Sequence, residues 1–175
     1  MTDSVELGRL EENGDGRWRL RFTRLLAHPL DVVWRAVSAP EQLAAWFPTT
    51  VEGERAAGAK LRFSFPQGQA EAFDGEMLAF EPPSLIEFGW GPDVIRIELH
   101  PVPGGTELTL IHIFAERGKG ARDAAGWHVC LSGLAAYLAG DPAPEDAMAE
   151  WKAIHPRYVA HFGPEAAVIG PPEGV

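Results

Sequence analysis

Hydrophobic and polar residues alternate along residues 17–27, RWRLRFTRLLA. A period of two places successive side chains on opposite faces of a β-strand, so this segment predicts a strand with one buried face. Arg24 interrupts that face. A shorter alternating segment, VELGRL at 5–10, lies before it, and the turn sequence EENGDG separates the two. The apolar face carries Trp18, Leu20, Phe22 and Leu26.

The pattern changes to a helical period between residues 28 and 48. Apolar residues recur at helical spacing after Pro29, which suits a first helical turn. A second short helix is predicted directly behind it. Ser38 with Glu41 three residues later forms a capping-box pattern, and Pro48 ends the segment.

Six further strand segments follow, separated by turn sequences such as PQGQ, PPS and PGG. Connections this short favour antiparallel pairing between neighbouring strands. The segments are residues 50–55, 59–65, 71–81, 84–91, 93–102 and 106–114.

The helical period returns after AERGKG at 115–120 and continues to Gly140, with one apolar stripe on the predicted helix. This order of elements predicts an α+β helix-grip fold. In it, a curved antiparallel sheet of about six to seven strands wraps around a long C-terminal helix, and two short helices follow the first long strand. We expect one domain over 1–143, with a C-terminal helical extension and mobile tail over 144–175 packed on it. The stripe consists of Trp127, Leu131, Leu134 and Leu138.

Composition restricts the possible partners. The 175 residues include 15 Lys and Arg against 25 Asp and Glu, a formal charge of −10, and the basic residues form no stripe. We therefore expect no binding to nucleic acid or to a membrane surface. The single cysteine excludes an internal disulfide and a cysteine-based zinc site, and no apolar run is long enough to span a bilayer. Without a signal-peptide pattern, we expect a cytoplasmic monomer or homodimer.

Several segments together resemble a known superfamily. FTRLLAHPLDVVWRAVSAPEQLAAWFP, GAKLRF, GTELTLIH and GWHVCLSGLAAYLAG, in this order, are similar to the SRPBCC (START/Bet v 1-like) superfamily. Within it they resemble the activator of Hsp90 ATPase homologue 1-like branch, from about Arg17 to Gly140. The resemblance implies the helix-grip fold with an apolar cavity between helix and sheet. It says little about activity, because the superfamily includes lipid and hormone binders, aromatases and co-chaperone domains.

Aromatic residues and a few polar ones are candidates for the cavity wall. The aromatics either line a pocket or form plain core, and Trp127 either anchors the helix or faces the cavity. An inward His112 would orient a ligand or be a buried histidine satisfied by a neighbour. Arg24 would anchor an acidic ligand group or pair with Glu87 or Glu98. The predicted cavity residues are Trp46, Phe47, Phe63, Phe65, Phe88, Trp90, His112, Trp127, Leu131 and Arg24.

His128 and Cys130 raise the question of a thiol–imidazole pair. Positions two apart on a helix point about 200° away from each other, so the two side chains cannot share a proton. Cys130 is interpreted as a buried thiol, and His128 as a polar group at the cavity rim or bonded locally. GKG at 118–120 is interpreted as a solvated turn. The sequence predicts no catalytic residue, no metal site and no cofactor.

The leading functional hypothesis is the binding of a small apolar or amphipathic molecule between sheet and helix. A chaperone-accessory module, similar to the Hsp90 ATPase activator, is the first alternative and requires an exposed apolar patch. The second is an aromatase- or cyclase-type enzyme that uses His112 for acid–base chemistry. That alternative requires His112 to line the cavity with a second polar group in reach.

Overall fold

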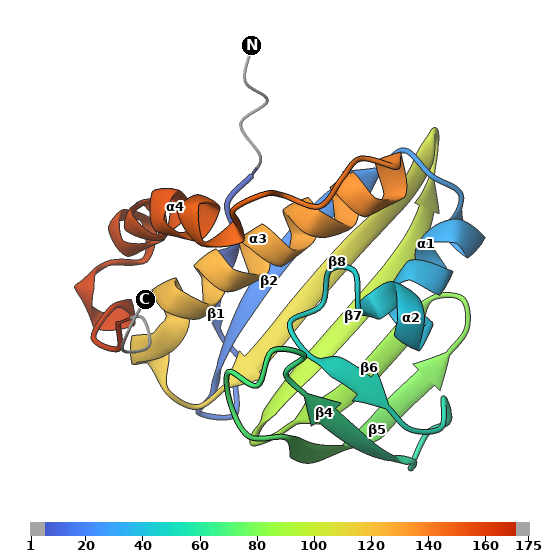
Figure 1. The fold of residues 1–175 in the computed structure, drawn as a ribbon. Coiled ribbons are helices and arrows are strands. Elements are labelled where there is room, and N and C mark those ends of the chain that lie inside the picture. Colours follow the sequence, from blue (N-terminus) through green and yellow to red (C-terminus); the bar gives the residue numbers. More distant parts are fainter. Residues whose placement is uncertain (1–5, 171–175) are drawn as a thin grey trace.

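A curved antiparallel sheet lies against one long helix in the computed structural model, which describes residues 6–170 (Figure 1). Within these residues the sheet has eight strands in the order β1-β2-β8-β7-β6-β5-β4-β3. The strands are β1 (Arg9–Glu12), β2 (Trp18–Leu26), β3 (Thr50–Glu52), β4 (Lys60–Ser64), β5 (Phe73–Glu81), β6 (Leu85–Trp90), β7 (Asp93–Val102) and β8 (Gly105–Phe114).

Four α-helices accompany the sheet in the described part of the chain. The third runs diagonally across the sheet, and the fourth lies beside it on the side away from the strands (Figure 1). Short 3-10 turns at Arg117–Lys119 and Pro164–Ala166 precede the third helix and follow the fourth. The helices are α1 (Leu30–Ser38), α2 (Pro40–Leu43), α3 (Gly120–Ala139) and α4 (Ala147–Phe162).

This architecture confirms the predicted helix-grip class, with eight strands instead of six or seven. The two short helices follow the first long strand, as expected. The predicted capping box is wrong: Ser38 belongs to the end of α1 and its hydroxyl donates to the Trp34 carbonyl at 2.6 Å. Ala39 occupies the N-cap position of α2 instead.

At the two ends of the chain, the predicted segments extend beyond the residues that the structure describes. The first strand begins at Arg9, whereas the predicted segment begins four residues earlier, at residue 5. Residue 5 lies outside the described residues. Part of the expected tail, 171–175, lies outside them as well.

The register of the central hairpin brings His112 to the inner face of the sheet. β7 pairs with β8 from Val102 opposite Gly105, which places Ile95 opposite His112. On the other side, His112 lies opposite Leu20 of β2. Leu20 and Ile95 are both fully buried, so His112 belongs to the same inward row.

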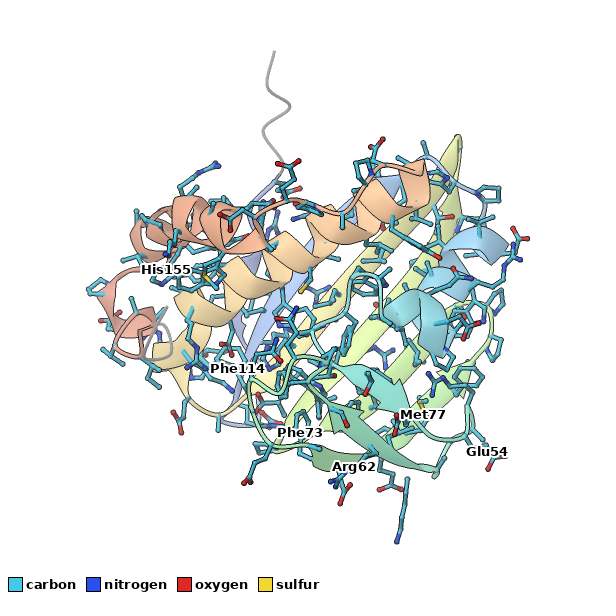
Figure 2. The ribbon with its side chains drawn as sticks, in the orientation of Figure 1. Glu54, Arg62, Phe73, Met77, Phe114 and His155 are labelled. Carbon is cyan, nitrogen blue, oxygen red and sulfur yellow. The ribbon has the colours of Figure 1, made fainter. Side chains whose placement is uncertain are left out.

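The core fills the space between this inner face and α3, as the side chains in Figure 2 show. Trp127, Leu131 and Leu134 of the predicted stripe are buried there, and Leu138 packs on the core near the end of α3. Gly140 ends the helix with φ +75°, a conformation that glycine adopts at low cost. None of the helices within residues 6–170 is both long and apolar enough to cross a bilayer.

Hydrogen bonds attach the C-terminal helix α4 to α3 and to the N-terminal segment. The Trp151 indole donates to the Arg122 carbonyl at 3.3 Å. The Tyr158 hydroxyl lies 2.8 Å from Nδ1 of His128 and accepts from the Gly8 N–H at 3.0 Å. Since the hydroxyl accepts from Gly8, its own hydrogen is free to go to His128. Tyr158 is fully buried, so α4 is held by a packed, bonded contact.

Candidate functional site

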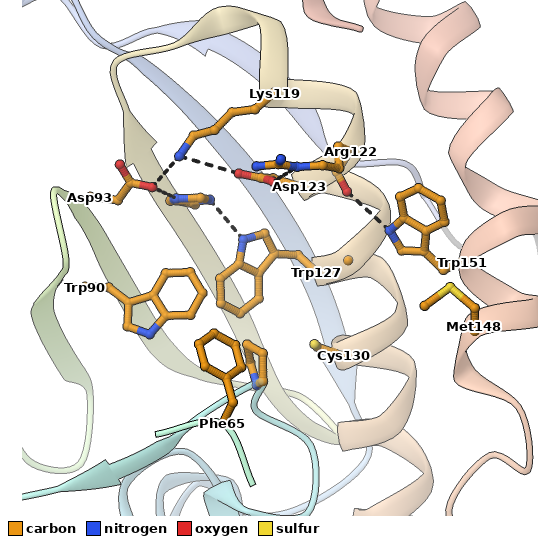
Figure 3. Close-up of a pocket in the computed structure, with 13 residues that line it drawn as sticks. Phe65, Trp90, Asp93, Lys119, Arg122, Asp123, Trp127, Cys130, Met148 and Trp151 are labelled. Atoms are coloured by element: carbon orange, nitrogen blue, oxygen red, sulfur yellow. Dashed lines mark hydrogen bonds and ion pairs between the residues drawn. The ribbon is translucent and has the colours of Figure 1, made fainter. Parts of the chain in front are cut away.

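A pocket of about 430 Å³ opens between α3, α4 and the sheet at the Lys119 end of α3 (Figure 3). Its volume falls within the range of roughly 300–1,000 Å³ that is usual for small-molecule sites. The pocket is lined by Pro48, Phe65, Trp90, Asp93, His112, Lys119, Arg122, Asp123, Gly126, Trp127, Cys130, Met148 and Trp151.

Aromatic rings and one methionine from four parts of the chain make the apolar wall. Trp90 at the end of β6 and Trp127 of α3 have ring centroids 5.6 Å apart with planes inclined at 51°. Phe65 from the β4–β5 loop lies below them in Figure 3. Met148 and Trp151 of α4 add the opposite side. Such surfaces gain free energy by burying apolar or aromatic ligand area.

A buried hydrogen-bonded chain forms the floor of the pocket. The Trp127 indole donates to Nδ1 of His112 at 3.0 Å, and Nε2 of His112 lies 2.8 Å from Oδ2 of Asp93. An indole N–H only donates, so Nδ1 of His112 carries no hydrogen and Nε2–H donates to Asp93. His112 is therefore held as the neutral Nε2–H tautomer with both ring nitrogens in use. It is only 1% exposed.

Charges alternate along the polar end of the pocket. The Lys119 ammonium lies 2.6 Å from Oδ2 of Asp93 and 3.7 Å from Oδ2 of Asp123. The Nε of Arg122 donates to Oδ1 of Asp123 at 2.9 Å. Burial by itself would raise the pKa of Asp93, but hydrogen bonds from His112 and Lys119 outweigh it and lower that pKa. Asp93 is thus a stable carboxylate and a weak base.

Cys130 and His128 take separate roles, as their helical spacing predicts. Cys130 is half-buried and lines the pocket, and burial raises the pKa of its thiol to about 12. A thiol with this pKa stays protonated and is a poor nucleophile. The His128 ring is bonded to Tyr158 beneath α4, away from the pocket lining. The two residues share no hydrogen bond.

Only part of the predicted cavity set lies at the pocket. Phe65, Trp90, His112 and Trp127 line it. The others, except Arg24, are packed in the hydrophobic core, where Phe47 contacts both Trp90 and Trp127 through its ring. The predicted residues outside the lining are Trp46, Phe47, Phe63, Phe88, Leu131 and Arg24.

Arg24 is the clearest departure. Its guanidinium donates to the backbone carbonyls of Glu6 and Thr23, at 3.2 and 2.9 Å, and does not line the pocket. The predicted ion pair is wrong, because Glu87 and Glu98 both pair with Arg96 on the outer face of the sheet.

The polar end of the pocket was missed by sequence reasoning. GKG is not a solvated turn: Gly118 and Gly120 are buried, and the Lys119 side chain is only 17% exposed. A usable signal existed for Asp93. The PGG turn fixes the β7–β8 hairpin register so that Asp93 shares a face with Ile95 and therefore with His112. Within residues 6–170, no group of three or more His, Cys, Asp or Glu side chains is placed to hold a metal ion.

Several solved structures share the fold of this chain. A conserved protein of unknown function from Enterococcus faecalis has a TM-score of 0.73 at 18% identity, with 89% of this chain and 90% of that chain covered. CalU16 from Micromonospora echinospora has a TM-score of 0.67 at 22% identity, with 89% and 98% covered. The protein encoded by gene BPP1335 of Bordetella parapertussis has 0.66 at 24% identity, with 90% and 94% covered. At these identities the likeness concerns the fold.

The family follows from the sequence itself. Residues 27–139, more than half of the chain, match the family described as activator of Hsp90 ATPase homolog 1-like protein. The chain belongs to this family, which confirms the resemblance drawn from the motifs. No curated protein is significantly similar to it.

Proposed function

We propose that this protein binds a small, largely apolar molecule in the pocket between α3, α4 and the sheet. The observation that carries the proposal is the aromatic wall of Phe65, Trp90 and Trp127 around about 430 Å³ of space, with polar groups confined to one end. Small-molecule sites typically combine an apolar lining with a few fixed polar groups. We also propose a cytoplasmic location for this activity.

The geometry favours binding over acid–base catalysis. His112 is inward and has Asp93 within reach, which is the arrangement that an aromatase- or cyclase-type enzyme would need. However, the Trp127 N–H occupies Nδ1, so His112 cannot accept a proton there without losing that bond. Asp93 is also a poor general base because its pKa is lowered. The chain from Asp93 to Trp127 therefore orients the pocket wall.

Native mass spectrometry of the purified protein, followed by denaturing extraction, tests the proposal. A co-purifying small molecule, or a thermal shift with members of a hydrophobic ligand panel, would support binding. A clean apo mass and no shift with any compound would argue against it and favour the chaperone-accessory alternative. That alternative would then be tested by chaperone pull-down and by the chaperone ATPase rate.

A further inference from the structure

The polar end of the pocket has balanced charge. Four charged side chains line the pocket, and they form the sequence Asp93, Lys119, Asp123, Arg122 with alternating sign. Each positive group has a carboxylate within 4 Å, and each carboxylate has a positive partner. His112 adds no charge because its Nδ1 accepts from Trp127. A ligand with a full charge would lose its hydration here and find no free counter-charge.

These four charged side chains can nevertheless form further hydrogen bonds with a ligand. Lys119 has three N–H donors, and its ion pairs with described residues involve two acceptor atoms, Oδ2 of Asp93 and Oδ2 of Asp123. Oδ2 of Asp93 receives both His112 and Lys119, whereas Oδ1 accepts from neither. Arg122 bonds Asp123 through Nε. Donors and acceptors are thus interleaved at one end of an otherwise aromatic pocket.

We propose that the ligand is a neutral aromatic molecule carrying a hydroxyl group at the end that meets Lys119 and Asp93. A hydroxyl both donates and accepts, so it can use an ammonium donor and a carboxylate acceptor at once. Hydrogen bonds to charged groups are about twice as strong as those between neutral groups. The aromatic body stacks against Trp90 and Trp127. This inference rests on the proposed binding function and specifies its ligand class.

Four compounds of one shape separate the possibilities: naphthalene, 1-naphthol, 1-naphthoate and 1-naphthylmethylammonium. Isothermal titration calorimetry with the full chain near neutral pH gives the affinities. We expect 1-naphthol to bind about tenfold tighter than naphthalene, and both ions to bind more weakly than 1-naphthol. Equal affinity for naphthol and naphthalene, or tightest binding of either ion, would overturn the hydroxyl inference and leave the binding function standing. If none of the four binds and the native mass is clean, both proposals fail.

Variants at the polar end locate the recognition. Lys119→Met should bring the naphthol affinity to within about threefold of the naphthalene affinity. Arg96→Met is the matched control, since Arg96 also pairs with two carboxylates but lies outside the pocket lining. It should keep the full naphthol preference. Retention of that preference in folded Lys119→Met would overturn the assignment.

A second variant keeps the test valid if Lys119→Met does not fold. Asp123→Asn removes one negative charge and leaves Lys119 and Arg122 in excess, so 1-naphthoate should bind several-fold tighter than to the unmodified chain. An unchanged naphthoate affinity would contradict charge balance as the basis of selection.

Discussion

Protonation of His128 is expected to make the fold sensitive to mild acid. Burial is the largest cause, and together with the positive charges of Arg24 and Arg157 it lowers the pKa of His128 from 6.5 to about 4. The side chain is bonded to Tyr158, and the residue is only 6% exposed. Between these two pH values the unfolded chain takes up a proton that the folded chain does not. Stability therefore falls as pH drops through this window.

The magnitude follows from the two pKa values. A difference of one pKa unit corresponds to about 1.4 kcal/mol, so the complete loss is about 3 kcal/mol. By pH 4.5 the loss relative to pH 7 should be about 2 kcal/mol. Most carboxylates titrate at about pH 4 or below, so the range above pH 4.5 mainly reports histidines. Urea denaturation at pH 7 and pH 4.5 measures the difference as a change in the free energy of unfolding.

Two variants assign the effect to His128. His128→Asn keeps an acceptor near Nδ1 but cannot titrate, so it should lose most of the pH dependence. The exposed His100 provides the control, and His100→Asn should behave as the unmodified chain does. His155 also has a pKa lowered by burial, so a residual slope is expected in His128→Asn. The reasoning would be refuted if His128→Asn lost the same stability between pH 7 and 4.5 as the parent.

Further predictions concern stability and reactivity. Tyr158→Phe leaves the buried His128 and the Gly8 N–H without their partner and should cost about 2–3 kcal/mol in urea denaturation; a loss below about 0.5 kcal/mol would contradict the bonding scheme. Cys130, with a thiol pKa raised to about 12, should react only slowly with iodoacetamide at pH 8 until urea unfolds the protein; rapid labelling of the folded protein would contradict the raised pKa. Gly75→Ala would drive its Cβ into the Gly89 carbonyl of the neighbouring strand and should lower Tm by several degrees, whereas Gly126→Ala, with open space around its Cα, should not.

The fold was readable from sequence because its signals are local. The alternation at 17–27, the turns between strands and the stripe from Trp127 to Leu134 each fix an element without reference to the others. The errors occurred at boundaries. β3, for example, ends at Glu52 and not at the predicted Arg55, and Gly53 directly after it has φ +140°.

The site was less predictable because it depends on contacts between distant segments. Aromatic content alone could not separate Trp90, which lines the pocket, from Phe63, which is fully buried beside it. Lys119 looked solvated because GKG has the composition of a turn, yet its ammonium meets Asp93, 26 positions earlier in the chain. The contribution of Met148 and Trp151 depends on where α4 docks, which no local pattern specifies.

The pocket is assembled from two parts of different origin in the chain. The family match ends at residue 139, where α3 ends, whereas Met148 and Trp151 lie beyond it on α4. The family match therefore includes the floor from Asp93 to Trp127 but not the outer wall on α4. Substitutions at Met148 and Trp151 would therefore change the outer wall of the pocket while the residues of the sheet and of the floor stay the same.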